Sequence, residues 1–223
     1  MNMNIKHKLV SSVMGAALLP AALCGAAVQA AENISYSYLE VEYVFGDELD
    51  ADVPGVSDRD VDGVRFKGSA ALTDNVFVWG SNAALDLDLP GGGNTSFDVQ
   101  SIGVGANYTL IPGVNQLDAW GGVSYERIDP AGSVADGYGL SAGLRWKALE
   151  ALELNAFGSY REYDDFDFLL AGEDSDGWVY GIGAVYSITP QLGLVANWER
   201  WEMEVGPIDP EVDLFSVGAR WSF

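Results

Sequence analysis

The chain ends with the segment Asp213-Leu214-Phe215-Ser216-Val217-Gly218-Ala219-Arg220-Trp221-Ser222-Phe223, and this segment decides the fold. From Phe215 onward its odd-numbered residues are apolar, whereas its even-numbered residues are small or polar, with one charge at Arg220. Because successive side chains of a β-strand point to opposite faces, this pattern gives one apolar and one polar face. At about 3.3 Å per residue and a tilt of roughly 40°, such a segment rises about 28 Å, close to the apolar band of about 25 Å that a transmembrane barrel strand crosses. The segment therefore indicates a strand with hydrocarbon on one side and water on the other.

The beginning of the chain has a different character. Lys6 and Lys8 precede an apolar stretch, and Val28-Gln29-Ala30 has the small-residue pattern of a cleavage site. These features are typical of a secretory signal peptide. We therefore expect residues 1–30 to be removed and residues 31–223 to form a single domain.

The expected mature chain is poor in the groups that most enzymes use. Its only candidates for cysteine and histidine chemistry, Cys24 and His7, lie in the segment expected to be removed. A Ser-His-Asp hydrolase and a zinc site with imidazole ligands are therefore excluded, and we expect neither catalysis nor a cofactor. Since Lys6 and Lys8 are also removed, 33 acidic residues face 9 of the 11 basic ones, a net charge of −24 that disfavours binding to nucleic acid.

Nine further segments alternate in the same way, and the pattern predicts a strand in each. The ten predicted strands are 38–45, 63–72, 77–85, 101–108, 117–126, 138–147, 152–161, 178–186, 192–201 and 213–223. In 77–85 the side chains predicted to face lipid are Phe77, Trp79, Ser81, Ala83 and Leu85. An even number of strands places both chain ends on one side, as in a closed antiparallel up-and-down transmembrane β-barrel. Eight strands is the alternative if 117–126 and one neighbour are not strands.

The predicted connections alternate in length. Those at 73–75, 110–116, 148–151 and 188–191 are short, whereas those at 47–60, 89–96, 129–136, 164–176 and 203–212 are longer and mostly acidic. Short periplasmic turns and long extracellular loops are typical of barrels in the bacterial outer membrane. The long connections are therefore predicted to be acidic extracellular loops.

Eleven charged residues fall on the faces predicted to line the lumen. They are Glu40, Glu42, Arg65, Lys67, Glu126, Arg145, Lys147, Glu153, Arg161, Glu199 and Arg220. A shift by one residue turns every side chain of a strand to the other face, and each Arg or Lys then facing lipid at mid-depth costs about 2–4 kcal/mol. For Arg65 and Lys67 together, this cost is comparable with a typical net stability of about 5–15 kcal/mol. The charges therefore fix which face points inward.

The expected depth of each strand also predicts ion pairs within this lumenal charge network. The predicted partners are Glu40 and Glu42 with Arg65 and Lys67, Lys147 with Glu153, and Arg220 with Glu40 across the contact that closes the barrel. The alternative is that water in the lumen solvates these charges separately. Partly buried ion pairs can contribute little net stability even when they are well formed.

Two acidic patterns in the sequence are candidates for cation sites. Asp58-Arg59-Asp60-Val61-Asp62-Gly63 has the spacing that opens a calcium loop, but Ser69 stands where such a loop needs a bidentate Glu, so we expect no metal site there. A looser hypothesis is that loop carboxylates recruit divalent cations that bridge lipopolysaccharide; solvated loop charge is the alternative. The carboxylates in question include Asp164, Asp165, Asp167, Glu173, Asp174 and Asp176.

With the alternating strands, the export signal and the C-terminal Trp221-Ser222-Phe223, the chain resembles the small bacterial outer-membrane β-barrel proteins, which include OmpA-, OmpX- and opacity-like transmembrane domains. This resemblance implies a place in the Gram-negative outer membrane, in contact with membrane lipid and lipopolysaccharide. It also implies that the barrel-assembly machinery reads Trp221 and Phe223. The segment Asn33-Ile34-Ser35-Tyr36-Ser37-Tyr38-Leu39-Glu40 looks like the start of barrels described as quorum-factor proteins, from which no activity follows.

Three functions are compatible with these features. The leading hypothesis is an integral outer-membrane barrel without catalytic activity, which has an envelope-structural or surface-interaction role. The first alternative is a narrow, porin-like pore for ions or small solutes, although Tyr38, Trp120, Phe157 and Trp201 are predicted to narrow the lumen. The second alternative is a soluble periplasmic ligand-binding barrel.

Overall fold

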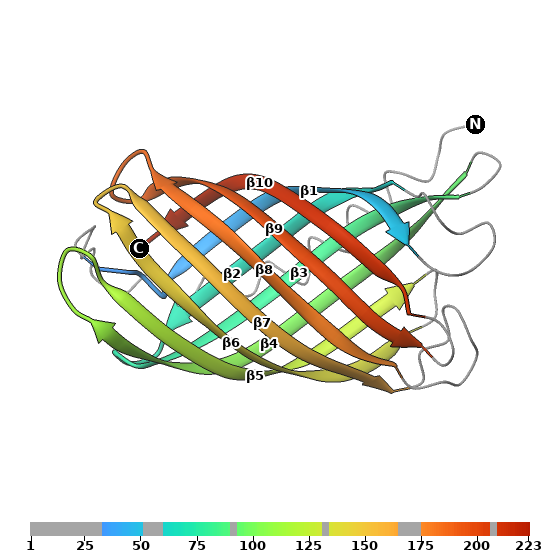
Figure 1. The fold of residues 1–223 in the computed structure, drawn as a ribbon, viewed down its shortest axis with the longest axis horizontal. Helices are drawn as coiled ribbons and strands as arrows, with labels where there is room; N and C mark the ends of the chain where they lie inside the picture. The colour runs from blue at the N-terminus through green and yellow to red at the C-terminus, as the bar shows by residue number, and fades with distance from the viewer. Residues whose placement is uncertain (1–32, 51–59, 90–92, 131–133, 165–174, 206–208) are drawn as a thin grey trace.

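The computed structural model of the chain describes residues 33–50, 60–89, 93–130, 134–164, 175–205 and 209–223. The predicted signal peptide lies outside the described residues. The strands are β1 (Tyr38–Asp50), β2 (Val61–Ala71), β3 (Val76–Leu89), β4 (Gly93–Ile111), β5 (Leu117–Pro130), β6 (Ala135–Leu149), β7 (Leu152–Asp164), β8 (Ser175–Ser187), β9 (Leu192–Val205) and β10 (Glu211–Ser222). Each strand pairs antiparallel with its neighbours in sequence, and β10 pairs with β1, so the ten strands form one closed barrel (Figure 1). The predicted fold is confirmed, with ten strands rather than eight.

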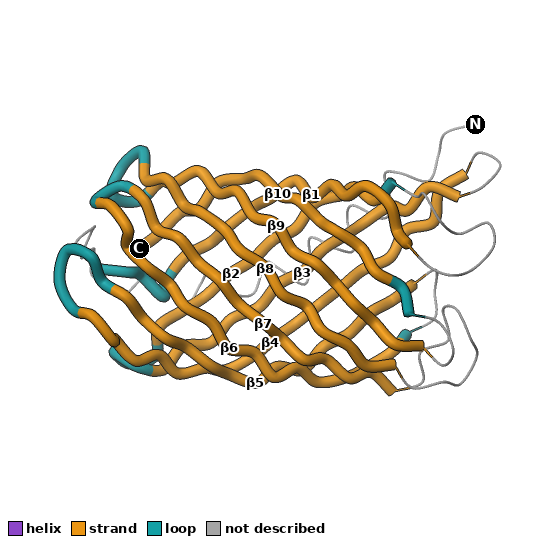
Figure 2. Tube along the Cα trace, viewed as in Figure 1, coloured by secondary structure: helices purple, strands orange, loops and turns teal. Residues whose placement is uncertain are grey.

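The strands cross the barrel at a slant and make up nearly all of its described wall (Figure 2). Among the described residues, no helix is long and apolar enough to cross a membrane. The four predicted short connections lie at the end of the barrel where the chain terminates, and the strand ends that flank the five predicted long loops lie at the opposite end (Figure 1). We call these the short-turn end and the long-loop end.

The strands extend further toward the long-loop end than the side-chain pattern indicates. Residues 94–96, predicted to belong to a loop, are part of β4 and pair with residues 86–88 of β3. The reason is that backbone hydrogen bonds between two strands can continue beyond the segment in which apolar and polar side chains alternate. The sequence pattern therefore locates the membrane-crossing part of each strand better than it locates the end of the hairpin.

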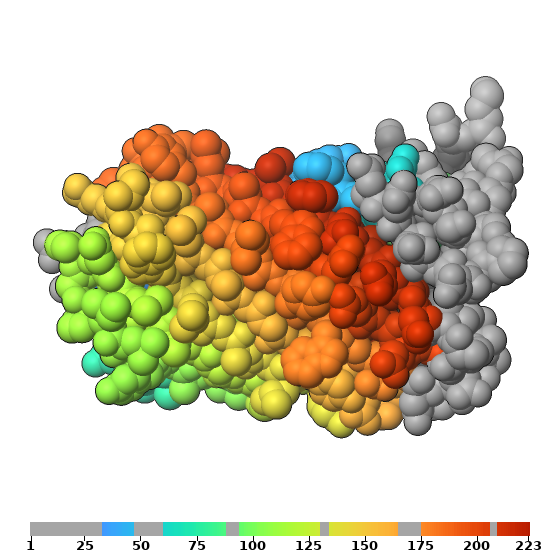
Figure 3. Space-filling model, in the orientation of Figure 1, coloured from blue at the N-terminus to red at the C-terminus, as the bar shows by residue number. Residues whose placement is uncertain are grey.

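The outer surface of the wall is apolar along its middle, as the alternation predicts. Large apolar side chains point away from the barrel on nine of the ten predicted strands, and the described strands form a continuous wall on the face shown in Figure 3. Examples are Tyr43, Phe66, Ile102, Val123, Leu140, Leu154, Ile182, Leu194 and Val217. The basic residues predicted to face inward lie inside the barrel, so the charge argument selected the correct face for the strands that carry them.

The prediction for β3 was wrong. Phe77 and Leu85 are only 5% and 3% exposed, and Trp79 and Ser81 line the barrel interior, so the side chains assigned to lipid face inward. Ala83, the remaining member of that set, is also buried inside. Residues 77–85 contain no charged side chain, so no charge penalty opposed the wrong face, and their large apolar side chains pack inside the barrel instead.

Inward-facing glycines on β4 and β5 create room for the aromatic rings of β3. A Cβ atom placed on Gly122 would lie 2.5 Å from the Trp79 ring, and one on Gly105 would lie 2.8 Å from the Phe77 ring. A Cβ atom on Gly143 would similarly lie 2.7 Å from the indole nitrogen of Trp120. These glycines are therefore required for close packing inside the barrel.

This packing predicts opposite effects at two adjacent glycines of β5. Gly122→Ala is expected to lower the free energy of unfolding by about 1–3 kcal/mol, because its methyl group would collide with Trp79 and with the backbone oxygen of Val104 at 2.6 Å. Gly121→Ala is expected to change it by no more than about 0.5 kcal/mol, because the nearest atom to its methyl group lies at 3.5 Å. Guanidinium unfolding of both variants in detergent micelles measures the difference. Equal destabilisation by the two substitutions would contradict the inward position of Trp79.

Candidate functional site

The barrel interior consists of three layers along its axis. An aromatic layer lies at the short-turn end, the lumenal charge network lies in the middle, and an apolar layer lies at the long-loop end. The order follows from the positions of these residues along their strands. The layers together determine what the interior can bind or conduct.

The aromatic layer is built around β3 and the segment 33–37 that precedes β1. Ile34, Tyr36 and Phe77 are buried together, with Trp79 and Trp120 packed against them. The Tyr36 and Phe77 ring centroids are 4.7 Å apart, and Trp79 and Trp120 meet edge to face at 6.3 Å. Such aromatic pairs stabilise a core beyond the area they bury. The aromatic layer therefore fills the short-turn end of the lumen.

Segment 33–37 is held in the mouth of the barrel by hydrogen bonds to β2, to β6 and to the connection before β5. The backbone nitrogen of Ile34 donates to Gln116 Oε1 at 3.1 Å, Ser69 Oγ donates to the carbonyl oxygen of Tyr36 at 2.8 Å, and Arg145 donates to the carbonyl oxygen of Ser35 at 2.8 Å. Sequence reasoning gave this segment no place in the interior. The alternation of Ile34 and Tyr36 with serines was the available signal.

Sequence reasoning also missed Asp118. This carboxylate is 1% exposed and accepts hydrogen bonds from Gln116 Nε2 at 2.8 and 2.9 Å. Its position is two residues before the inward-facing Trp120, so strict alternation along β5 would have placed it in the lumen. The available signal was therefore the same period of two that found the other acids.

The centre of the lumenal charge network is Arg65 of β2. Its Nε lies 2.6 Å from Glu42 Oε2, its Nη1 lies 2.8 Å from Glu199 Oε2, and its Nη2 donates to Ser216 Oγ at 3.2 Å. Lys67, two residues further along β2, lies 3.2 Å from Glu42 and 3.9 Å from Glu199. The strands β1, β2, β9 and β10 are thereby joined through their side chains, in addition to the backbone ladder.

The predicted contact across the closing strands is present. Arg220 of β10 and Glu40 of β1 are direct partners in the register, and Arg220 Nε lies 2.6 Å from Glu40 Oε2. Glu40 is also 3.5 Å from Lys67 Nζ, as the depth argument predicted. Arg220 additionally approaches Glu153 of β7 at 3.6 Å, so the network crosses the lumen.

The predicted partnership of Lys147 and Glu153 is only partly reproduced. The two residues are register partners on β6 and β7, but the Glu153 carboxylate forms its ion pair with Arg145 at 2.8 Å. These contacts connect eight residues, four of each sign, into one network. The eight are Glu40, Glu42, Arg65, Lys67, Arg145, Glu153, Glu199 and Arg220.

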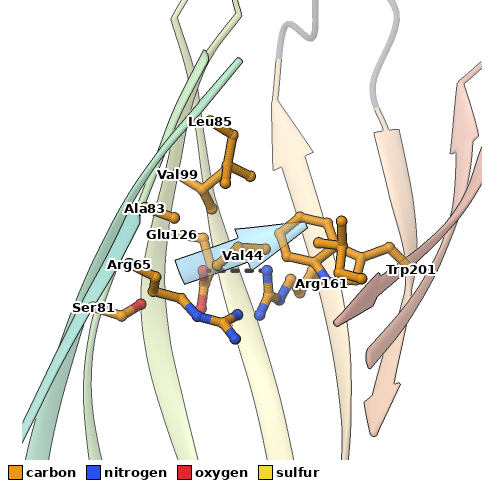
Figure 4. Close-up of a pocket in the computed structure, with 10 residues that line it drawn as sticks. Val44, Arg65, Ser81, Ala83, Leu85, Val99, Glu126, Arg161 and Trp201 are labelled. Carbon is orange, nitrogen blue, oxygen red and sulfur yellow. Dashed lines mark ion pairs between the residues drawn. The ribbon is translucent and has the colours of Figure 1, made fainter. Parts of the chain in front are cut away.

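Arg161 and Glu126 form a looser pair beside this network. Arg161 Nη1 is 4.0 Å from Glu126 Oε2, and its guanidinium lies over the Trp201 ring at 4.7 Å (Figure 4). Glu126 accepts a hydrogen bond from Ser124 at 2.5 Å through its other oxygen. In Figure 4 the side chains of Arg65 and Arg161 extend toward each other from opposite walls, with Glu126 beside them. A space of about 30 Å³ lies at this level.

The apolar layer covers the network on its long-loop side. Its buried members come from nine of the ten strands, with Trp201 and Met203 among the side chains packed against them. The buried members are Val44, Val61, Ala83, Leu85, Leu87, Val99, Ile128, Ala135, Tyr163, Val205 and Leu214. The described residues thus place a hydrophobic core inside the barrel, where an open pore would need water.

A cavity of about 210 Å³ remains between the aromatic and apolar layers. Its walls carry most of the charged residues predicted for the lumen, together with several serines and aromatic rings. Five of the six inward basic residues line it, and the sixth, Lys147, is buried near the short-turn end. This cavity is larger than the space of about 30 Å³ beside Arg161 and Glu126.

The acidic patterns considered as cation sites do not form a metal centre within the described residues. No group of three or more His, Cys, Asp or Glu side chains there could hold a metal ion. Asp58 and Arg59 lie outside the described residues, and Asp62 accepts a hydrogen bond from Tyr43 at 3.1 Å. Of the loop carboxylates named above, Asp165, Asp167, Glu173 and Asp174 also lie outside the described residues.

On the outer surface, aromatic side chains near the long-loop end donate hydrogen bonds to acids on the next strand. Representative distances are 3.0 Å for Tyr160 and Asp176, and 3.1 Å for Trp198 and Asp213. The full set is Tyr43–Asp62, Tyr125–Asp136, Tyr138–Glu162, Tyr160–Asp176, Tyr180–Glu202 and Trp198–Asp213. An aromatic ring with a polar tip suits the boundary between an apolar band and water.

Three solved structures illustrate what the chain is similar to. The attachment invasion locus protein Ail of Yersinia pestis is 14% identical, with 84% of this chain and 99% of that chain covered and a TM-score of 0.38. Neisserial surface protein A is 14% identical, with 85% and 98% covered and a TM-score of 0.41. An outer membrane channel from Pseudomonas putida F1 is 11% identical, with 89% and 99% covered and a TM-score of 0.47.

No curated protein is detectably similar in sequence to this chain. The family comparison is more informative, because residues 16–223 match the family described as the outer membrane protein beta-barrel domain. This match covers nearly the whole chain and agrees with the closed barrel and its apolar outer face. The chain therefore belongs to the outer membrane protein beta-barrel domain family.

Proposed function

We propose that this outer-membrane barrel is closed and non-catalytic, with an envelope-structural or surface-interaction role. Membership of the family places the protein in the outer membrane, where its apolar outer face contacts lipid, so a soluble periplasmic barrel is not supported. As further parts of the proposal, residues 1–30 act as a signal peptide, and the assembly machinery reads Trp221 and Phe223. The proposed surface role includes the binding of divalent cations, which would bridge exposed carboxylates to lipopolysaccharide.

The observation that carries the proposal is the apolar layer at the long-loop end. An ion that crosses this level must leave water, and a charge transferred into apolar surroundings without a partner is strongly disfavoured. Val44, Leu85, Val99 and Leu214, on four different strands, are among its buried members. The aromatic layer supports the proposal from the other end of the lumen.

The charges in the middle of the lumen also favour a closed structural barrel over a pore. Arg65 and Arg220 each contact two carboxylates, and the connected network contains four charges of each sign. Paired charges of this kind hold strands together across the lumen, whereas a conducting path needs charged groups that remain hydrated. The same pairing leaves the acids of the network engaged in ion pairs, which supports a role without acid–base catalysis.

Conductance in planar bilayers tests this proposal. We expect the purified barrel to insert without opening steady channels, because the apolar layer excludes hydrated ions. The matched variant is Val44→Gly with Leu85→Ala and Val99→Ala, which removes side chains from that layer and is expected to conduct measurably. Steady ohmic channels of equal size in the unmodified protein and in the variant would favour the pore instead.

A further inference from the structure

The cavity between the layers is lined by buried polar atoms that have no hydrogen-bond partner within the protein. These atoms belong to four residues, of which Glu40 and Glu126 are each 3% exposed and Tyr36 is 8% exposed. They are Tyr36 Oη, Glu40 Oε1, Glu126 Oε2, and Arg161 Nε and Nη1. Buried polar groups are normally hydrogen-bonded, because leaving one unsatisfied costs free energy. The cavity is therefore built to receive a polar occupant.

The mixture of donors and acceptors indicates the chemistry of that occupant. Arg161 offers only donors, the Glu126 carboxylate offers only acceptors, and the Tyr36 hydroxyl can do both. A hydroxyl group both donates and accepts, so one hydroxyl can satisfy Arg161 and Glu126, which lie 4.0 Å apart. A simple anion would satisfy Arg161 but would face Glu126 Oε2, an acceptor that lacks a hydrogen-bond donor.

The charge of the lining favours a neutral occupant. Five basic residues and four carboxylates line the cavity, and the fifth carboxylate, Glu42, lies directly behind Arg65 and Lys67 at 2.6 and 3.2 Å. The local charges are therefore balanced before any ligand binds. A ligand with a net charge would have to lose its hydration without gaining an opposite charge in return.

The non-polar part of the lining is aromatic. Rings of Phe77, Trp79, Trp120 and Phe157 contribute to the cavity, and two serine pairs lie on its walls. Ser81 and Ser101 are hydrogen-bonded at 2.9 Å, as are Ser141 and Ser159. Aromatic faces pack against C–H surfaces, while serine and carboxylate groups bind hydroxyls, so the lining suits a compact molecule with both features.

From this placement we propose that the cavity binds a neutral polyhydroxylated solute of monosaccharide size, with Arg161 and Glu126 sharing one of its hydroxyls. The volume of about 210 Å³ corresponds to roughly seven waters at about 30 Å³ each, so ordered water alone is the competing occupant. The proposal concerns a ligand inside the barrel, and it holds whether the surface role proposed above is structural or interactive.

Binding of myo-inositol, compared with cyclohexanol, tests this inference. The two rings have the same carbon skeleton, but only myo-inositol has a hydroxyl on every carbon. Because segment 33–37 covers the short-turn end, the barrel is folded in the presence of each probe and then studied by saturation-transfer NMR and tryptophan emission. We expect saturable binding of myo-inositol and none of cyclohexanol. Equal or non-saturable signals from the two probes would mean that the cavity holds water only, and would overturn the proposal.

Two variants identify the site. Arg161→Gln is expected to weaken binding of myo-inositol about tenfold or more, since hydrogen bonds to a charged group are among the stronger ones. Its matched control is Arg200→Gln. Arg200 forms an ion pair with Asp213 at 2.7 Å and does not line the cavity, so this variant should bind myo-inositol with unchanged affinity. Ser141→Leu, which fills part of the cavity without removing a charge, should also abolish binding if Arg161→Gln does not fold. Unchanged affinity in whichever of the two cavity variants folds would overturn the site.

Discussion

Replacing Arg65 with methionine is expected to lower the free energy of unfolding by about 3–5 kcal/mol, because it leaves buried carboxylates without their main partner. Arg65 contacts Glu42 at 2.6 Å and Glu199 at 2.8 Å, and both acids are almost completely buried. Lys67 can compensate only in part, since it already approaches Glu40 at 3.5 Å. Guanidinium unfolding of the barrel in micelles measures the loss.

The control for Arg65→Met is Arg200→Met on the outer face. Arg200 has a comparable ion pair, 2.7 Å from Asp213, but both side chains are about one-third exposed, so the expected loss is within about 1 kcal/mol. Adding Glu199→Gln to Arg65→Met should recover part of the stability, because one uncompensated charge disappears. The coupling energy from the full cycle is expected at about 0.5–3 kcal/mol. If both methionine variants lose the same amount, the network does not stabilise the barrel through burial.

The interior was predictable from the sequence wherever charge decided the register. Arg65, Lys67 and Arg220 could face lipid only at a cost of several kcal/mol, so the inward face of β2 and β10 followed from their positions. The depth of Glu40 on β1 then placed it opposite Arg220, and the structure has that pair at 2.6 Å. Contacts between residues far apart in sequence could be predicted here, because the position of a residue along its strand gives its height along the axis of an antiparallel barrel.

The same reasoning failed for β3, although the equally uncharged residues 101–108 and 178–186 were assigned correctly from apolar alternation alone. Residues 77–85 offer two faces without charges, and the rule of apolar residues outward selected the wrong one. A better criterion was the run of inward glycines on β4 and β5, because the space they leave has to be filled by large side chains from a neighbouring strand. Segment 33–37 could not be placed from alternation alone, since its position depends on contacts with Gln116 and Arg145 that are far away in sequence.

Replacing Phe77 with alanine is the corresponding test of the aromatic layer. The expected loss is about 3–5 kcal/mol of unfolding free energy, because Phe77 is 5% exposed and its ring packs against Tyr36 at 4.7 Å and Trp79 at 5.6 Å. A cavity left at this position also removes the support for segment 33–37. Guanidinium unfolding gives the energy, and faster proteolysis ahead of β1 would report release of the segment.

The matched control is Phe66→Ala on the adjacent strand β2, whose ring is 52% exposed on the outer face. There lipid or detergent chains fill the space that the ring leaves, so the expected loss is no more than about 1 kcal/mol. The comparison separates the two registers of β3, because an outward Phe77 would respond as Phe66 does. Equal small losses of unfolding free energy for both variants would indicate that Phe77 faces lipid, and would contradict an aromatic layer in the lumen.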